Sequence, residues 1–171
     1  MISEQQKFTA QQSLTLGMSK AETFFQRSFD PPELTFNQRG NIAGTAHLQK
    51  NIIKLNPVLL ADNLEQFCHT VIPHELAHIL VFQMHGRVKP HGQEWRAMMQ
   101  NVFTLPPHVK HQMDVTKTQG KTFKYQCGCA KIDLSVRRHN KVVRRQQEYV
   151  CRKCNTLLSY VGTNSGNDSV V

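Results

Sequence analysis

The stretch HELAHILVFQMHGRVKPHGQEW, residues 74–95, constrains this chain more than any other part of its sequence. An α-helix returns to the same face about every 3.6 residues, so His74 and His78 are predicted to point the same way. Two imidazoles in this arrangement can hold one metal ion, at about 2.0–2.1 Å when the ion is zinc. Glu75 lies about 100° round the helix, where its carboxylate can exchange protons with a water beside the metal. The pattern is HExxH.

A third protein ligand is needed, and the same helix cannot supply it. His85 would lie about 16 Å along the helix axis from the first histidine, which is too far for a shared ion. Gly86 and Pro90 allow the chain to turn back, so that His91 can reach the metal. Glu94 is a rival third ligand, because a carboxylate can replace an imidazole. Three ligands leave a fourth position to water, which is typical of a catalytic zinc site.

The ends and apolar runs of the chain indicate its compartment. The N-terminal sequence MISEQQKFTAQQ is polar and lacks the charged and apolar regions of a signal peptide. No apolar run approaches the roughly 18 residues needed to span a membrane. We therefore expect a cytoplasmic protein with no membrane segment, in which cysteines serve as thiols or as metal ligands.

Four of the five cysteines form two close pairs near the C-terminus. They are Cys127, Cys129, Cys151 and Cys154. Two such pairs are typical of a zinc ribbon, in which two tight turns hold one tetrahedral zinc. The CxC spacing is tighter than the usual CxxC, so His139 is an alternative for one thiol, and disulfides are another alternative. The fifth cysteine, Cys68, falls on the apolar side of a predicted helix and is expected to pack in the core.

The formal net charge of +9 falls almost entirely in one segment. Residues 1–116 carry a net charge of +1, whereas residues 117–160 hold 11 Lys/Arg against two acidic residues. A solvated charged face is the common explanation of such a run, but this excess favours contact with phosphates. Nucleic acid is predicted to bind without sequence preference. The expected contacts are Arg137, Arg138, Lys141, Arg144 and Arg145.

The distribution of apolar residues predicts an α+β fold. Helices are expected up to about residue 29, over about 62–84, and from about His91 to the LPP at 105–107. Pro73 is predicted to kink the second helix just before His74, unless the helix only begins there. Three short segments, ELTFNQ, GTAHLQ and NIIKLN, are expected to pair as a small, mostly antiparallel sheet.

The chain is predicted to divide into a helix-and-sheet domain at 1–116, a basic zinc-ribbon module at 117–160 and a disordered tail at 161–171. Within the module, alternating residues between the cysteine pairs predict a hairpin that turns near His139–Asn140. About 40 residues build little core of their own, so zinc is expected to supply much of the folding energy of the module.

These segments together resemble the SprT-like family. The resemblance rests on LNPVLL, then VIPHELAHILVF, then HGQEW, then the paired cysteines around VRRHN, and it covers about residues 10–160. It implies a compact zincin-like metallopeptidase domain followed by a zinc ribbon. It assigns the metal-ligand roles to His74, His78 and His91, and the catalytic role to Glu75.

The resemblance also suggests substrates and partners. Eukaryotic relatives of the Spartan type are proteases that cut proteins crosslinked to DNA, whereas bacterial members are usually described only as zinc-binding cytoplasmic proteins. Two functions are therefore predicted. One is a zinc metallopeptidase acting on proteins held on DNA, and the other is a zinc-binding, nucleic-acid-associated protein with little or no peptidase activity.

Overall fold

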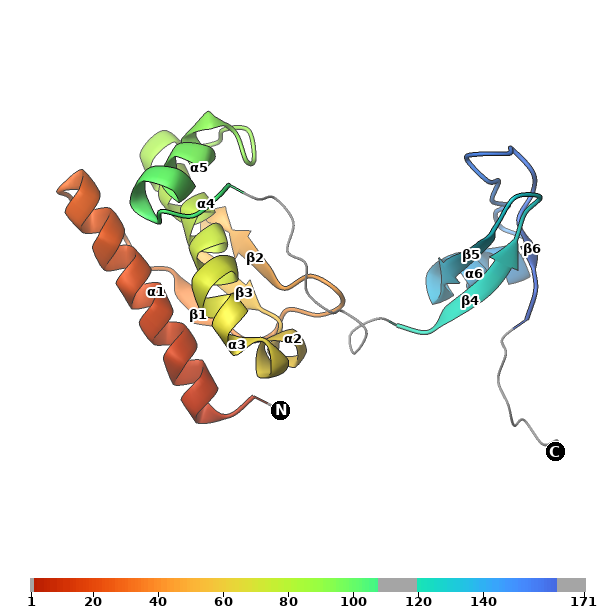
Figure 1. The fold of residues 1–171 in the computed structure, drawn as a ribbon, viewed down its shortest axis with the longest axis horizontal. Coiled ribbons are helices and arrows are strands. Elements are labelled where there is room, and N and C mark those ends of the chain that lie inside the picture. The colour runs from red at the N-terminus through yellow and green to blue at the C-terminus, as the bar shows by residue number, and fades with distance from the viewer. Residues whose placement is uncertain (1, 108–119, 163–171) are drawn as a thin grey trace. The chain divides into compact units, whose positions relative to one another are not determined.

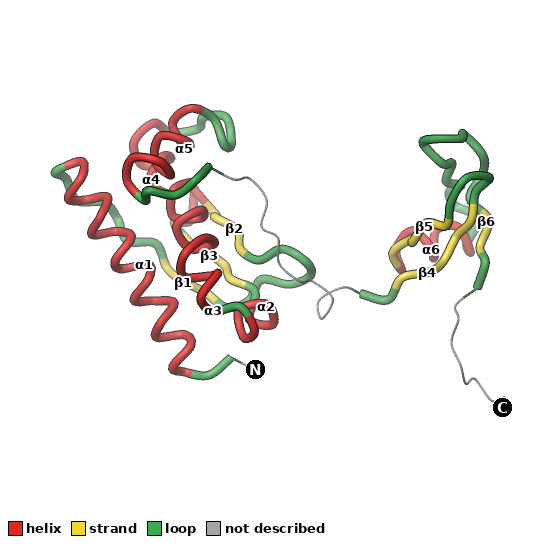
Figure 2. The backbone as a smooth tube through the Cα atoms, viewed as in Figure 1, coloured by secondary structure: helices red, strands yellow, loops and turns green. Residues whose placement is uncertain are grey.

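The structure, a computed structural model, describes residues 2–107 and 120–162 (Figure 1). Helices and two small sheets make up these residues, which confirms the predicted α+β class (Figure 2). No helix among the described residues is long and apolar enough to cross a membrane.

The chain divides into two compact units, an N-terminal unit at 1–119 and a C-terminal unit at 120–171. The predicted domain boundary at 116/117 lies outside the described residues, and so does nearly all of the predicted tail. Each unit has its own cluster of buried residues, the larger one in the N-terminal unit.

The N-terminal unit is built around helix α4, which contacts both the long helix α1 and strand β2 (Figure 1). The elements of this unit are α1 (Glu4–Phe25), β1 (Glu33–Thr35), β2 (Gly44–His47), the 3₁₀ turn η1 (Leu48–Lys50), β3 (Ile52–Leu55), α2 (Pro57–Asp62), α3 (Leu64–Gln66), the π-helical turn η2 (Phe67–Val71), α4 (Ile72–His85), α5 (Gln93–Ala97) and the π-helical turn η3 (Met98–Val102).

The N-terminal sheet has strand order β1-β3-β2, with β3 in the centre. Strand β2 pairs antiparallel with β3, as expected for neighbours joined by a short turn. Strand β1 pairs parallel with β3, so the prediction of a mostly antiparallel sheet is wrong for one of the two strand pairs. The order leaves β2 at an edge, beside α4.

Helix α1 begins with a capping box, in which Ser3 and Gln6 each accept a hydrogen bond from the backbone of the other. It ends at Phe25, four residues before the predicted end. Gly17 lies on its buried side, where an added Cβ would lie 2.7 Å from the Leu76 side chain. A glycine that weakens the helix locally therefore allows α1 and α4 to approach closely.

The helical chain from α3 to α4 is interrupted by the π-helical turn η2, whose closing bond runs from the Ile72 N–H to the Phe67 carbonyl. Pro73 has no N–H to donate to the carbonyl of His69, so the wider turn lies where an α-helical bond is missing. The disturbance predicted just before His74 takes this form. Helix α4 then ends at His85 and is capped by Gly86, which has a positive φ of 70°.

The C-terminal unit is a three-stranded antiparallel sheet with one helix. Its elements are β4 (Thr122–Gln126), β5 (Lys131–Ser135), α6 (Val136–Val143) and β6 (Ser159–Tyr160). Its small core comprises Tyr125, Leu134, Leu158 and two of the cysteines. So small a core agrees with the expectation that a metal stabilises this unit.

The hairpin predicted to turn near His139–Asn140 is wrong, because residues 136–143 form the helix α6. The hairpin of this unit is instead formed by β4 and β5. His139 and Val142, three residues apart, are half-buried, while Arg137 and Arg138 beside them are exposed. That spacing is helical, and it outweighs the strand preference of the three valines in the segment.

Candidate metal centres and catalytic residue

Three imidazoles converge in the N-terminal unit. The Nε2 atom of His91 lies 3.1 Å from the Nε2 atom of His74 and 3.1 Å from that of His78. Zinc bound tetrahedrally at about 2.05 Å holds its nitrogen ligands about 3.3 Å apart, so this donor set fits zinc. Glu94, the rival third ligand, is not among the groups whose ligand atoms meet here.

The loop between α4 and α5 brings His91 to the other two histidines. His91 has a left-handed backbone with φ of 55°, which is uncommon for a residue with a side chain. The next residue, Gly92, donates its N–H to the Lys89 carbonyl at 2.9 Å. An added Cβ at Gly92 would lie 2.8 Å from that same carbonyl oxygen. The tight turn therefore requires glycine at position 92 and aims the imidazole of His91 back toward α4.

Trp95 packs against all three imidazoles, a role that the sequence did not reveal. Its ring centroid lies 4.6–5.5 Å from those of the histidines, and the side chain is only 1% exposed. Its Nε1–H donates to the backbone carbonyl of His74 at 3.3 Å.

Glu75 is buried beside this site and accepts a hydrogen bond from the backbone N–H of Ala46 on the edge strand β2. Burial raises the pKa of Glu75 to about 7, and the Ala46 bond opposes this rise only in part. Strand β2 can lie close to the Glu75 side chain because Gly44 has no side chain of its own. An added Cβ there would lie 3.0 Å from Cγ of Glu75. Neither Gly44 nor Ala46 could be assigned from the sequence, because both contacts are long-range.

The environment keeps the imidazoles of His78 and His91 neutral, which is the form that binds metals. Burial, with a smaller contribution from the neighbouring His91, lowers the pKa of His78 to about 4. Burial also lowers the pKa of His91, with a smaller contribution from the positive charge of Arg96. Both nitrogen lone pairs are therefore available at neutral pH.

Four thiols converge in the C-terminal unit. The Sγ atom of Cys129 lies 3.6 Å from that of Cys127 and 3.7 Å from that of Cys151, and Cys154 completes the group. Tetrahedral zinc at about 2.3 Å holds its sulfur ligands about 3.8 Å apart, so the geometry fits a zinc ribbon. No disulfide joins the cysteines, all of which lie within the described residues.

Two tight turns present these thiols. In the first, the Cys127 N–H donates to the Ala130 carbonyl, and in the second the Cys151 N–H donates to the Thr156 carbonyl. The Thr156 hydroxyl lies 2.9 Å from Cys154 and lowers the pKa of that thiol to about 6. The pKa of Cys129, at the centre of the cluster, rises to about 12 through its bonds with the other thiols. Four sulfurs this close cannot all ionise without a cation, and a zinc ion held by the four cysteines would supply that charge.

The sequence model of the SprT-like family matches residues 15–119, and that of the SprT-like zinc ribbon domain matches residues 121–162. The chain belongs to the SprT-like family. The first match contains the three converging histidines and Glu75, and the second contains the four converging cysteines. The family resemblance predicted from the motifs is therefore confirmed.

Relatives in this family cover nearly the whole chain. Protein SprT of Vibrio parahaemolyticus is 48% identical over 155 residues, which is 91% of this chain and 94% of the relative. Protein SprT of Actinobacillus succinogenes is 50% identical over 155 residues, 91% of each chain. No solved structure matches this SprT-like chain.

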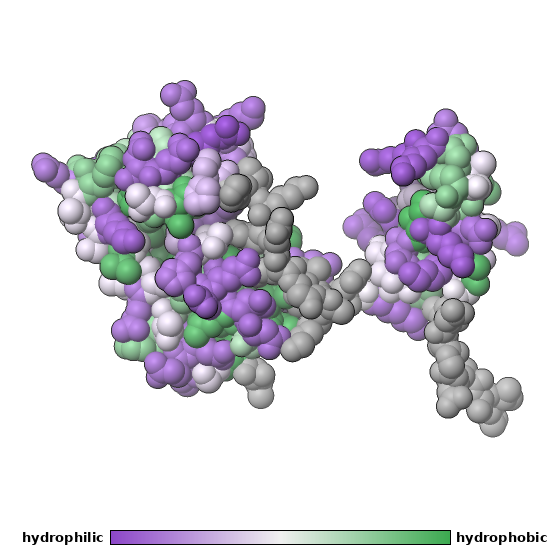
Figure 3. Space-filling view, viewed as in Figure 1, coloured by the Kyte–Doolittle hydropathy of each residue, from purple (hydrophilic) through white to green (hydrophobic). Residues whose placement is uncertain are grey.

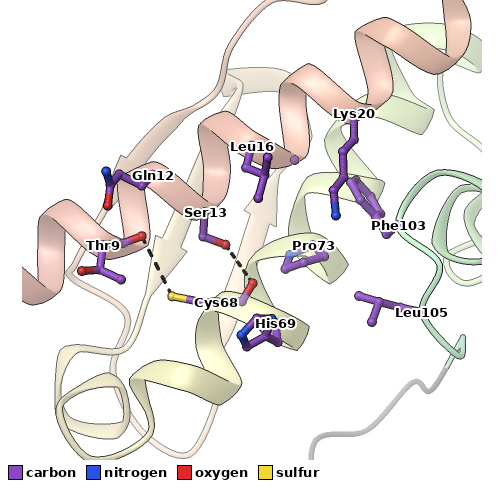
Figure 4. A pocket seen from close by; sticks show the side chains of 11 residues that line it. Thr9, Gln12, Ser13, Leu16, Lys20, Cys68, His69, Pro73, Phe103 and Leu105 are labelled. Atoms are coloured by element: carbon purple, nitrogen blue, oxygen red, sulfur yellow. Dashed lines mark hydrogen bonds between the residues drawn. The ribbon is translucent and has the colours of Figure 1, made fainter.

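The alternative ligand His139 and the fifth cysteine, Cys68, lie outside the two groups of converging ligand atoms in this SprT-like chain. The ring of His139 stacks on Phe123 with centroids 3.6 Å apart, and its Nδ1 lies 3.0 Å from the Tyr125 hydroxyl. It does not join the thiol cluster. Cys68 is half-buried beside a hollow of about 270 Å³ between α1 and η2, with its Sγ 4.0 Å from the Thr9 carbonyl (Figure 4). Burial raises its pKa, as expected for an unreactive thiol.

The basic residues expected to contact nucleic acid lie on α6 and in the turn after it. Four of the five are exposed, and hydrophilic side chains cover much of the visible face of the unit (Figure 3). Lys141 is half-buried, and its Nζ donates to the side chain of Gln147 at 3.1 Å. The exposed members are Arg137, Arg138, Arg144 and Arg145.

Proposed function

We propose that this SprT-like protein is a zinc-dependent metallopeptidase of the cytoplasm that acts on proteins bound or crosslinked to DNA. The observation that carries the proposal is the convergence of His74, His78 and His91 with a buried carboxylate one residue along the same helix. The four cysteines are proposed to hold a second, structural zinc. Their free thiols fit a reducing compartment.

The proposed chemistry divides between the metal and Glu75. Zinc at the histidines supplies a Lewis acid that polarises the carbonyl of the scissile bond and acidifies water. Glu75 accepts the proton of the attacking water and later delivers it to the leaving amine. A carboxylate whose pKa burial raises to about 7 suits both steps near neutral pH.

The hydrogen-bonding groups along the open edge of strand β2 favour the interpretation that the substrate is a polypeptide. The N–H of Ala46 is directed to Glu75, so it points away from β3 and toward the open edge. In an antiparallel strand the carbonyl of the same residue points the same way, so it is available to a substrate N–H. An extended segment of substrate can therefore bind along β2 as an added strand, beside the three histidines.

The charge of the C-terminal unit supports DNA as the partner. Residues 117–160 hold 11 Lys/Arg against two acidic residues, and four arginines on and after α6 are exposed. Exposed arginines bind phosphates of any sequence. Such binding would concentrate the protease on proteins that are themselves held on DNA.

The test compares zinc-loaded wild type with Glu75→Gln on two substrates, a protein crosslinked to an oligonucleotide and the same protein free. We expect wild type to cleave the crosslinked protein faster, and Glu75→Gln to cleave neither. Glu65→Gln, an exposed carboxylate on α3, is the matched control and should cleave like wild type. Equal cleavage by Glu75→Gln would refute the catalytic assignment, and equal rates on both substrates would refute the role of DNA.

The second candidate is a nucleic-acid-associated zinc-binding protein with little or no peptidase activity. The confinement of the positive charge to the C-terminal unit favours it, because that charge lies apart in sequence from the histidines. Salt titrations of oligonucleotide binding test it. Replacing Arg144 and Arg145 by glutamine should lower the slope of log affinity against log salt by about 2, while Lys20→Gln with Arg39→Gln leaves it unchanged. DNA binding without any cleavage would favour this candidate.

A further inference from the structure

We infer that a pocket one helical turn beyond the histidine site is a subsite for an acidic side chain of the substrate. The inference rests on the proposed peptidase function. The pocket, called here the basic pocket, has a volume of about 430 Å³. The lining residues that matter are His47, Lys50, Phe82, Arg87, Val88 and Pro90.

Three elements that build the histidine site also build the basic pocket. Phe82 follows His78 by four residues on α4, so its side chain lies about one turn further along the same side of the helix. Pro90 immediately precedes His91. His47 is the last residue of β2 and follows Ala46, whose N–H binds Glu75. A polypeptide lying along β2 past the histidines therefore brings one of its side chains to this pocket.

The lining combines an apolar interior with positive charge. Phe82, Val88 and Pro90 are apolar, and none of the described residues that line the pocket is acidic. Lys50 and Arg87 are both exposed.

Neither cation forms an ion pair with an acidic side chain in the part of the chain that the structure describes. The ion pairs among the described residues are Lys7–Glu4 and Lys124–Asp133, so Lys50 and Arg87 have no acidic partner there. An apolar stem that ends in a carboxylate, as in glutamate, matches an apolar interior with two cations. Phosphate of a bound nucleic acid is the competing ligand, but it has no apolar stem to occupy the space between Phe82 and Val88.

Binding to an inactive protein tests the subsite without any need for catalysis. Zinc-loaded Glu75→Gln is titrated with two pooled libraries of labelled extended peptides, which are identical except that Glu and Asp in one are Gln and Asn in the other. We expect the acidic library to bind about tenfold more tightly. Adding Lys50→Gln and Arg87→Gln should abolish the preference, and adding Lys20→Gln and Arg39→Gln should preserve it. If Glu75→Gln without further substitutions binds the acidic and the amide library with equal affinity, the inference is overturned.

Mapping of cleavage sites separates this inference from the proposed function. Wild type is incubated with an unfolded protein, and mass spectrometry should find acidic residues enriched at one fixed distance from the cut. Cleavage without such enrichment would overturn the subsite and leave the peptidase standing. Absence of cleavage together with the binding preference would overturn the peptidase and leave the subsite standing. Loss of oligonucleotide affinity on replacing Lys50 and Arg87 would overturn the subsite in favour of phosphate.

Discussion

The backbone N–H of Ala46 donates a hydrogen bond to the carboxylate of Glu75, and so joins the edge strand to the helix that carries two of the histidines. The contact depends on Gly44, which leaves the space that the Glu75 side chain occupies. One strand therefore orients the proposed general base and also offers its open edge to a substrate. The position of β2 is thus part of the proposed active site.

We predict that Gly44→Ala impairs catalysis more than it impairs folding. The added methyl would lie 2.9 Å from Val71 and 3.0 Å from Glu75, so strand and helix must separate. Overpacking of this kind costs about 1–3 kcal/mol of stability, and the peptidase rate should fall at least about tenfold as Glu75 moves. Urea unfolding and cleavage rates measure the two effects. Gly120→Ala, where an added Cβ meets nothing within 4 Å, is the control and should change neither. Full activity of Gly44→Ala would separate β2 from the mechanism.

We predict that the chain binds two zinc ions and that His91→Ala binds one. His91 is the member of the histidine group that lies outside α4, where His74 and His78 are placed. Two histidine ligands hold zinc far more weakly than three. His85→Ala is the matched control, since His85 is exposed at the end of α4 and does not join the group. Metal analysis of the dialysed proteins gives the stoichiometry. Two zinc ions in His91→Ala would reject this residue as a ligand.

We predict that Cys151→Ser unfolds the C-terminal unit and leaves the N-terminal unit folded. Cys151 is buried in the small core of the unit, and its thiol belongs to the converging group. Structural zinc in small domains supplies about 10–16 kcal/mol, which is more than this core can replace. Hydrogen exchange of the strands β4 and β5 should become fast, while exchange in α4 stays slow. Cys68→Ser should leave β4 and β5 protected, because Cys68 lies outside the cluster. Protected strands in Cys151→Ser would contradict a structural zinc.

We predict that Glu75→Gln stabilises the metal-free chain increasingly as the pH rises from about 4.5 to about 7. The pKa of Glu75 is raised in the folded state, so over this range the unfolded state ionises first and wild type loses stability. Glutamine does not ionise, and the difference should reach about 3 kcal/mol at pH 7. Below pH 4.5 the carboxyl is protonated in both states, and the difference should level off. Urea unfolding with chelator at several pH values measures it, with Glu65→Gln as the control. A difference that does not change with pH would mean that Glu75 is not held in a buried, apolar environment.

The histidine geometry could be predicted because it follows from local rules. His74 and His78 share a face through the period of the helix, and the glycine and proline after α4 imply a return of the chain to His91. Pro73 likewise predicted an irregularity in the helix just before His74, although it did not predict that this would be a π-helical turn. Each of these inferences needs only residues within about two dozen positions of one another.

The rest depends on contacts that are distant in sequence or on competing local preferences. Gly44 and Ala46 belong to the site only because β2 is the edge strand beside α4, and the strand order cannot be derived from periodicity. The parallel pairing of β1 was missed for the same reason. The helix α6 was missed because its valines favour strands, while the helical spacing of His139 and Val142 becomes decisive only when packed on the sheet.

The left-handed backbone of His91 has a consequence for the exchange of metal. A residue with a side chain reaches φ of 55° only at some cost in free energy, and coordination of the proposed zinc ion would offset that cost. We therefore expect departure of the ion to begin with relaxation of the loop at His91, while the two helical imidazoles keep it as a pair. Chelators and competing cations would then reach the ion from the side of this loop. The lifetime of the bound ion would depend on the stiffness of the seven residues from Gly86 to Gly92.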